Sequence, residues 1–148
     1  SFVGIDRKGQ SVTIETKREC GVSPVIKGAC LGNVGVDCKD AQKLQNFYAE
    51  LLGWGKSIMY GCPAVSDRNG IVFLFDASDD YDYTPPVWPE EPGKQQKQMH
   101  FDFQVDDLPA AVIEAEALGA VKAGSQYGGD HFVTMFDPEG HPFCLCAK

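Results

Sequence analysis

The chain has 148 residues and a formal net charge of −8 at pH 7, from 13 Lys and Arg against 21 Asp and Glu. Its length suits one domain with a sizeable core, and 43% hydrophobic with 23% charged residues is typical of a folded globular protein. An acidic chain repels nucleic-acid phosphates and anionic membrane surfaces, so we expect neither as a partner.

The cysteine pattern and the apolar runs bear on the cellular compartment. The chain contains six cysteines: Cys20, Cys30, Cys38, Cys62, Cys144 and Cys146. Disulfide frameworks are typical of short secreted chains with little core, whereas a reduced thiol in an apolar segment behaves as a small hydrophobe. The first ten residues lack a signal-peptide core, and the apolar runs are too short to span a bilayer. We expect a cytoplasmic protein with free thiols.

The N-terminal part of the chain divides into an arm and a first structural module. Residues 1–27 form the arm, in which Val12 and Ile14 alternate with polar residues and indicate one extra strand. The first module covers residues 28–76. Val34 and Val36 predict its first strand, and Asp40 is positioned to cap a helix that ends at Gly53. Three strands are expected after the helix, at residues 56–60, 63–66 and 71–75.

The order of elements then repeats after a change in composition. Residues 77–97, which are rich in acidic residues and proline, indicate a linker or lid. The second module covers residues 98–148. An alternating strand at 98–105 precedes a helix that Asp106 or Asp107 caps and Gly119 ends, and strands are expected near 121–127, 131–136 and 142–147. The fold class is therefore α+β, with two βαβββ modules in one domain.

Polar residues on the repeated first strands suggest a binding site. His100 and Asp102 share the strand face opposite Phe101 and Phe103, and Asn33 and Asp37 take matching places in the first module. A solvated face is the simpler interpretation, but two polar faces in related strands favour a cleft for a small ligand. Further groups that this cleft would bring to the site are Asp76, Cys144, Trp54 and Trp88.

Several of these residues have a structural alternative. Cys144 beside His100 is either a nucleophile–base pair or simply a buried thiol, and the buried thiol is the commoner case. Trp54 either lines the pocket or packs at the helix end. His131 and His141 stand beside turns, which indicates surface or turn-capping roles.

The ordered set of motifs resembles the vicinal oxygen chelate superfamily, of the glyoxalase/bleomycin-resistance type and its glyoxalase-like branch. The motifs that carry the resemblance are Gly32–Cys38, Asn46–Tyr48, Leu51–Trp54, Pro85–Pro89, Met99–Phe103, Val105–Leu108 and Asp137–Cys144. The resemblance implies two modules whose curled mixed sheets surround a shared cleft. It also implies, in metal-using relatives, two His and two Glu ligands from the first and fourth strands of the modules.

Carried onto this chain, that ligand set is incomplete. His100 keeps a ligand identity, Asn33 stands where His is usual, and Cys144 stands where Glu is usual. The fourth position falls on Asp76 or, in another register, on Leu74. We therefore favour no cofactor and a metal-free pocket in which His100 acts as a hydrogen-bonding or proton-transfer group.

The expected function is small-molecule binding, of the kind found in resistance proteins, by a homodimer. The alternative is a lyase, isomerase or dioxygenase that holds zinc, iron, manganese or nickel through His100, Asp76 and Cys144. Whether the protein is an enzyme stays open at this point, because one fold hosts many functions.

Overall fold

The computed structural model describes residues 2–5, 11–14, 25–79 and 82–148. The chain forms two compact units, Ser1–Leu31 and Gly32–Lys148. In the first unit, β1 (Phe2–Ile5) pairs antiparallel with β2 (Ser11–Ile14). β2 is the strand expected around Val12 and Ile14, and β1 was not anticipated.

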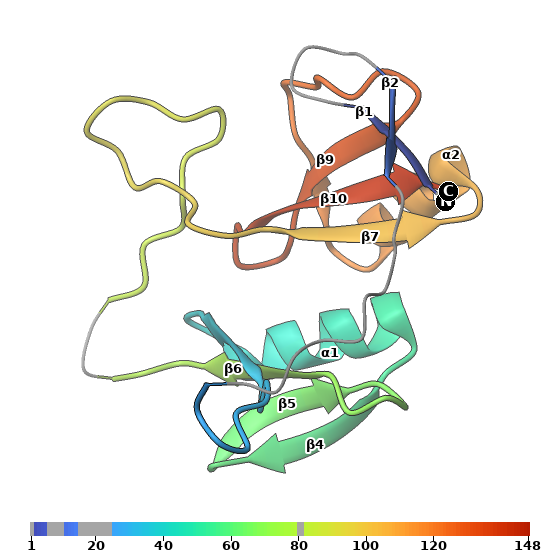
Figure 1. Ribbon diagram of the computed structural model, residues 1–148. Coiled ribbons are helices and arrows are strands. Elements are labelled where there is room, and N and C mark those ends of the chain that lie inside the picture. The colour runs from blue at the N-terminus through green and yellow to red at the C-terminus, as the bar shows by residue number, and fades with distance from the viewer. Residues whose placement is uncertain (1, 6–10, 15–24, 80–81) are drawn as a thin grey trace. The chain divides into compact units, whose positions relative to one another are not determined.

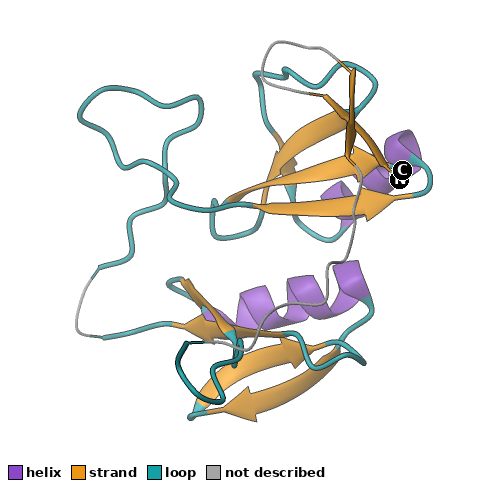
Figure 2. Cartoon of the chain, viewed as in Figure 1, coloured by secondary structure: helices purple, strands orange, loops and turns teal. Residues whose placement is uncertain are grey.

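The second unit contains two modules with the same order of elements (Figures 1 and 2). The first comprises β3 (Val34–Asp37), α1 (Ala41–Leu52), β4 (Gly55–Met59), β5 (Cys62–Ser66) and β6 (Val72–Asp76). The second comprises β7 (Phe101–Val105), α2 (Leu108–Ala117), β8 (Val121–Lys122), β9 (Phe132–Phe136) and β10 (Pro142–Ala147). The sheet orders are β3-β6-β5-β4 and β7-β10-β9-β8, and only the first and last strands of each module pair in parallel. The predicted fold class of two βαβββ modules is confirmed.

Local sequence signals explain both helix starts. The Asp40 carboxylate accepts a hydrogen bond from Lys43 N at 3.0 Å, and the Asp107 carboxylate accepts one from Ala110 N at 3.0 Å. Each satisfies a backbone donor that the first helical turn leaves free. Gly53 ends α1 in the left-handed region, with φ +65°, as its place in the sequence predicts.

An aromatic cluster joins the two modules into one core. Tyr48 of α1, which is fully buried, stacks on Phe75 of its own sheet with ring centroids 5.6 Å apart. The same ring meets the edges of Phe101 at 6.0 Å and lies 6.2 Å from Phe103, both in β7. Phe73 stacks on Phe101 at 4.4 Å. Burial of each such ring stabilises the fold by about 1.5–3 kcal/mol. Because Tyr48 contacts rings of both modules, α1 stabilises both of them.

The strand predicted at 98–105 is shorter than expected. β7 begins at Phe101, so His100 directly precedes the strand, and Met99 is 72% exposed instead of packing beneath a helix. The pairing register explains this, because β10 begins at Pro142 and its Phe143 is already level with Phe101. Residues 98–100 therefore have no ladder partner, and proline offers no N–H to extend the pairing.

The connecting segment carries no helix or strand in its described part, residues 77–79 and 82–97. It folds back on itself, because Val87 N donates to Gln95 O at 2.9 Å. No helix among the described residues is long and apolar enough to cross a membrane. The five described cysteines are free, and Cys20 lies outside the described residues.

Candidate functional site

A pocket of about 250 Å³ lies beside the edge strands β3 and β7. Its walls come from residues 34–37 of β3, from residues 83–86 and 95–101, and from His141 and Pro142. The lining combines apolar side chains with about as many polar or charged ones, so the pocket can take a small organic molecule that carries polar groups. Both modules and the connecting segment thus contribute to one pocket.

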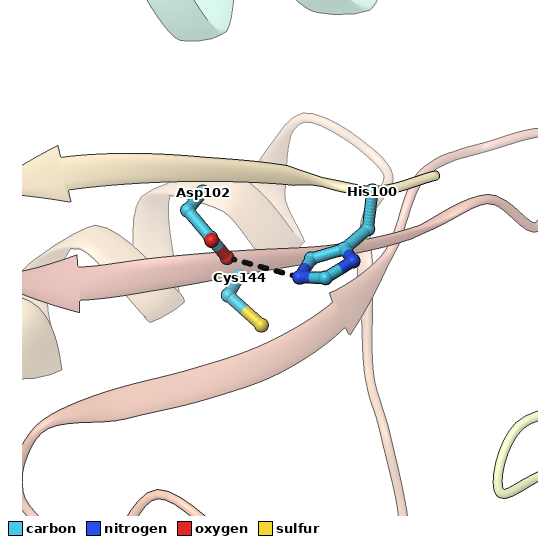
Figure 3. A group of neighbouring side chains, drawn as sticks. All are labelled: His100, Asp102 and Cys144. Atoms are coloured by element: carbon cyan, nitrogen blue, oxygen red, sulfur yellow. Dashed lines mark ion pairs between the residues drawn. The ribbon is translucent and has the colours of Figure 1, made fainter. Parts of the chain in front are cut away.

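His100 lines this pocket and is one of three neighbouring potential ligands (Figure 3). One donor atom from each of His100, Asp102 and Cys144 lies within 4.8 Å of the others. His100 Nε2 is 3.4 Å from Asp102 Oδ1, and these side chains are 43% and 59% exposed. The imidazole is therefore accessible at the open edge of the pocket and can exchange hydrogen bonds with a ligand.

Cys144 has the environment of a structural thiol. Its Sγ lies 3.6 Å from Thr134 Oγ1, and the side chain is partly buried. Burial raises the pKa of the Cys144 thiol; the bond to Thr134 lowers it, and the charge of Asp102 raises it further. The thiol is neutral at pH 7 and a poor nucleophile, which favours the structural interpretation over a nucleophile–base pair.

The strand register locates the fourth ligand position of the first module. Asp102 pairs with Cys144 in the second sheet, and Gly35, the residue at the place of Asp102 in the first module, pairs with Leu74. Leu74 is thus the counterpart of Cys144. Asp76 is two residues further along β6, on the same face as Leu74, and pairs with Asp37.

The other residues proposed from the sequence have separate environments. Asp37 lines the pocket, whereas Asn33, which directly precedes β3, does not. Trp54 packs on Phe73 with centroids 4.9 Å apart, in agreement with the helix-end alternative. Trp88 lies beneath the Lys97 ammonium, whose Nζ is 3.8 Å from the ring centroid.

Sequence reasoning missed a buried polar network beside the pocket. Asp137, only 3% exposed, accepts a hydrogen bond from the Tyr48 hydroxyl at 2.7 Å and lies 2.8 Å from His141 Nδ1. His141 Nε2 lies 2.7 Å from the backbone oxygen of Asp37. Because a carboxylate and a carbonyl both accept, both ring nitrogens donate only when the imidazole is protonated. Through these bonds the network links α1 and β3 to the turn that precedes β10.

The charge state of His141 reflects opposing effects. Burial lowers the pKa of His141, but the hydrogen bond and charge of Asp137 and the bond to the Asp37 carbonyl together raise it. A signal for this role did exist in the sequence. The turns Asp67–Gly70 and Asp137–Gly140 are copies, and His141 occupies the place of the apolar Ile71.

We expect the stability contributed by His141 to depend on pH. A pKa raised above the ordinary 6.5 means that the folded state binds the proton more tightly than the unfolded chain. The stability that His141 contributes is complete below the ordinary pKa of 6.5, and it is lost as pH rises through the higher folded-state pKa. Urea unfolding at about pH 5.5 and about pH 9 should show the gap between wild type and His141→Gln shrinking at the higher pH. A gap that is independent of pH would contradict this assignment.

Comparison with known proteins places the chain in a family. Residues 33–146 match the family described as glyoxalase-like domain. The chain belongs to this family. Comparison with curated protein sequences found no match.

Solved structures show the same fold as this glyoxalase-like domain. A glyoxalase/bleomycin resistance protein/dioxygenase family enzyme from Burkholderia phytofirmans is 18% identical with a TM-score of 0.59, covering 80% of this chain and 98% of its own. A glyoxalase/bleomycin resistance protein from Albidiferax ferrireducens is 14% identical with a TM-score of 0.55, covering 80% and 98%. TnmS3, an antibiotic-binding protein from a Streptomyces species, is 14% identical with a TM-score of 0.52, covering 80% and 95%.

The donor set of this glyoxalase-like domain does not fit the four-ligand metal site that its resemblance implies. The four positions hold Asn33, Leu74, His100 and Cys144. Leu74 offers no ligand atom, and an Asn amide is a weak ligand for transition metals. Only two of the four places retain a usual metal ligand, and the first module supplies neither.

Proposed function

We propose that this glyoxalase-like domain binds a small organic molecule in the pocket beside β3 and β7, without the metal site of its metal-using relatives. The observation that carries the proposal is a pocket with walls from both modules, combined with Leu74 at a ligand position. His100 serves as the hydrogen-bonding group at the open edge. One structural neighbour is an antibiotic-binding protein, which supports a binding function on this fold.

The pocket volume and lining limit the ligand. About 250 Å³ is slightly below the usual range of ligand sites, so the pocket accepts a molecule of one or two rings. Val34, Phe101 and Pro142 provide apolar walls for such a ring, and Gln98 provides an amide at the edge. Binding would then combine burial of a ring with one or two hydrogen bonds.

Gly35→Val is expected to block the pocket without unfolding the protein. Gly35 lines the pocket, and a Cβ added there meets no atom within 4 Å, so the new side chain occupies free space. Valine also suits a strand position. Chelator-treated protein should bind the neutral probe tryptophol, seen as NMR shifts at residues 34–37 and 95–101, and Gly35→Val should weaken this binding at least about tenfold.

Gly55→Val is the matched control for this experiment. Gly55 lies in β4, at the opposite edge of the same sheet, and a Cβ there lies 3.9 Å from the nearest atom, Ser66 O. The tryptophol affinity of Gly55→Val should stay near the wild-type value, and so should the melting temperatures of both glycine variants. Tryptophol shifts that fall elsewhere, or that survive Gly35→Val, count against the proposed pocket.

A metal-dependent function is the second candidate, and one observation favours it. His100, Asp102 and Cys144 together offer the nitrogen, oxygen and sulfur ligands that Zn²⁺ accepts. The Cys144 thiol would have to lose its proton against a raised pKa, which weakens binding at neutral pH. Equilibrium dialysis against Zn²⁺ separates the candidates, because one retained ion per chain that is lost in both His100→Ala and Cys144→Ala would replace the metal-free proposal.

The homodimer and the cytoplasmic location stay predictions. Exposed apolar side chains on and after the edge strand β4 favour a dimer. Ile58 is 67% exposed and Tyr60 is 87% exposed. Sedimentation velocity at micromolar concentration tests the prediction, and a single 16.1 kDa species would exclude a stable dimer.

A further inference from the structure

We propose that the pocket selects a cationic organic ligand, a protonated amine carried on an apolar ring, with Asp37 as its counter-charge. This inference rests on the proposed function, because it names the class of molecule that the same pocket would take. Four groups that can carry a charge line the pocket. They are one carboxylate, Asp37, and three basic side chains, Lys97, His100 and His141.

The charge of Lys97, the one lysine of the lining, is already balanced by contacts within the protein. Its ammonium group forms an ion pair with Glu90, and it also lies over the face of the Trp88 indole, 3.8 Å from the ring centroid. Only 19% of the Lys97 side chain is exposed. An anionic ligand would have to compete with both contacts, so Lys97 offers little free positive charge.

The two histidines also face acceptors within the protein. Both ring nitrogens of His141 are engaged, by Asp137 at 2.8 Å and by the backbone oxygen of Asp37 at 2.7 Å. His100 Nε2 lies 3.4 Å from Asp102 Oδ1, so any positive charge on this ring faces a carboxylate. Each basic side chain of the lining therefore already faces an acceptor or a carboxylate of the protein.

Asp37 differs from these groups. It is exposed at the end of β3, and its carboxylate forms no ion pair with any residue in the described ranges 25–79 and 82–148. Asp76 is level with it on the neighbouring parallel strand and adds a second negative charge to the same end of the sheet. The chain as a whole is also acidic, with a net charge of −8. An uncompensated carboxylate in an acidic field attracts a cation and repels an anion.

The open space around Asp37 leaves room for the amine. Gly35, two residues earlier on the same strand face, lines the pocket, and a Cβ there would meet no atom within 4 Å. The apolar walls formed by Val34, Phe101 and Pro142 would take the ring. A ring in the pocket with its amine toward Asp37 satisfies both the apolar lining and the unpaired charge.

Three probes of one shape and different charge test this inference. Tryptamine is the cation, tryptophol the neutral analogue and indole-3-acetate the anion, each titrated by NMR into chelator-treated protein at neutral pH and low salt. We expect tryptamine to bind at least about fivefold more tightly than tryptophol, and indole-3-acetate to bind most weakly. Added salt should reduce the differences in affinity among the three probes, because it screens an exposed charge.

Variants assign the preference to one carboxylate. Asp37→Asn should lower the tryptamine affinity to that of tryptophol and leave the tryptophol affinity unchanged, whereas Asp37→Glu should retain most of the preference. Asp79→Asn is the matched control, since Asp79 is exposed, lies outside the lining and changes the net charge equally. If Asp79→Asn lowers the tryptamine affinity as much as Asp37→Asn does, the preference comes from the net charge of the protein, and the assignment to Asp37 is wrong.

The remaining outcomes separate the two proposals. If all three probes bind at a Gly35-dependent site with equal affinity, or with the anion tightest, the charge inference is wrong and the proposed pocket stands. If none of the probes shifts residues 34–37 and 95–101, or if Gly35→Val leaves binding intact, the proposed function fails and the inference fails with it.

Discussion

Asp137→Ala is expected to lower the free energy of unfolding by about 3–5 kcal/mol, because it removes the acceptor of a buried network. The substitution leaves the Tyr48 hydroxyl without its partner at 2.7 Å and the His141 imidazole without its counter-charge at 2.8 Å. Burial raises the pKa of Tyr48 well above its usual range, and the charge of Asp137 adds to this, so the phenol stays protonated and needs an acceptor.

The internal duplication supplies a control for Asp137→Ala. Asp67 occupies the same place in the first module, where its Oδ1 accepts from Asn69 N at 2.9 Å and from Ile71 N at 2.7 Å. Asp137 Oδ1 makes the equivalent bonds to Glu139 N and His141 N. Asp67→Ala should therefore cost about 1–2 kcal/mol, for the turn alone. Urea unfolding of both variants measures the difference, and equal losses would show that the contacts between modules contribute nothing.

Gly140→Ala is expected to cost about 2–4 kcal/mol in unfolding free energy, from two separate causes. Gly140 has φ +87°, a conformation that disfavours any Cβ. The added methyl would also lie 2.9 Å from Cβ of Pro85 in the connecting segment. Since Tyr83 and Pro86 line the pocket on either side of this contact, we also expect weaker tryptophol binding.

Gly70→Ala isolates the second cause. Gly70 is the counterpart of Gly140 in the first module, with φ +84°, but an added Cβ there meets no atom within 4 Å. This variant should lose only the conformational part, about 1–2 kcal/mol, and keep its tryptophol affinity. If Gly70→Ala and Gly140→Ala behave alike in melting and in binding, the contact with Pro85 carries no weight.

The fourth-strand position shows how far strand patterns reach. Leu74 and Asp76 both lie on the face opposite Phe73 and Phe75, because side chains alternate along a strand. Alternation therefore assigns the face and leaves the position along the strand open. Only the pairing of Gly35 with Leu74, a contact between strands distant in sequence, identifies the counterpart of Cys144.

His141 illustrates the opposite difficulty. Its sequence neighbours, Asp137 to Gly140, predict a turn correctly, and a histidine beside a turn is usually a surface residue. Its other partner, the backbone oxygen of Asp37, lies in the first module. The comparison of the two turns marks His141 as unusual, but no local pattern identifies a partner so far away in the chain. The imidazole was consequently missed as a wall of the pocket.

Local sequence patterns predicted the two modules, the Asp40 cap and, as one of two candidates, the Asp107 cap, together with the polar character of the residues around His100. These features depend on backbone donors, turn geometry and hydrophobic alternation, which act over a few neighbouring residues. Tertiary structure decided which polar groups share a pocket, that Trp54 belongs to the core, and which charges are already paired. Those outcomes depend on how edge strands and loops from both modules pack together, and packing is a property of the whole fold.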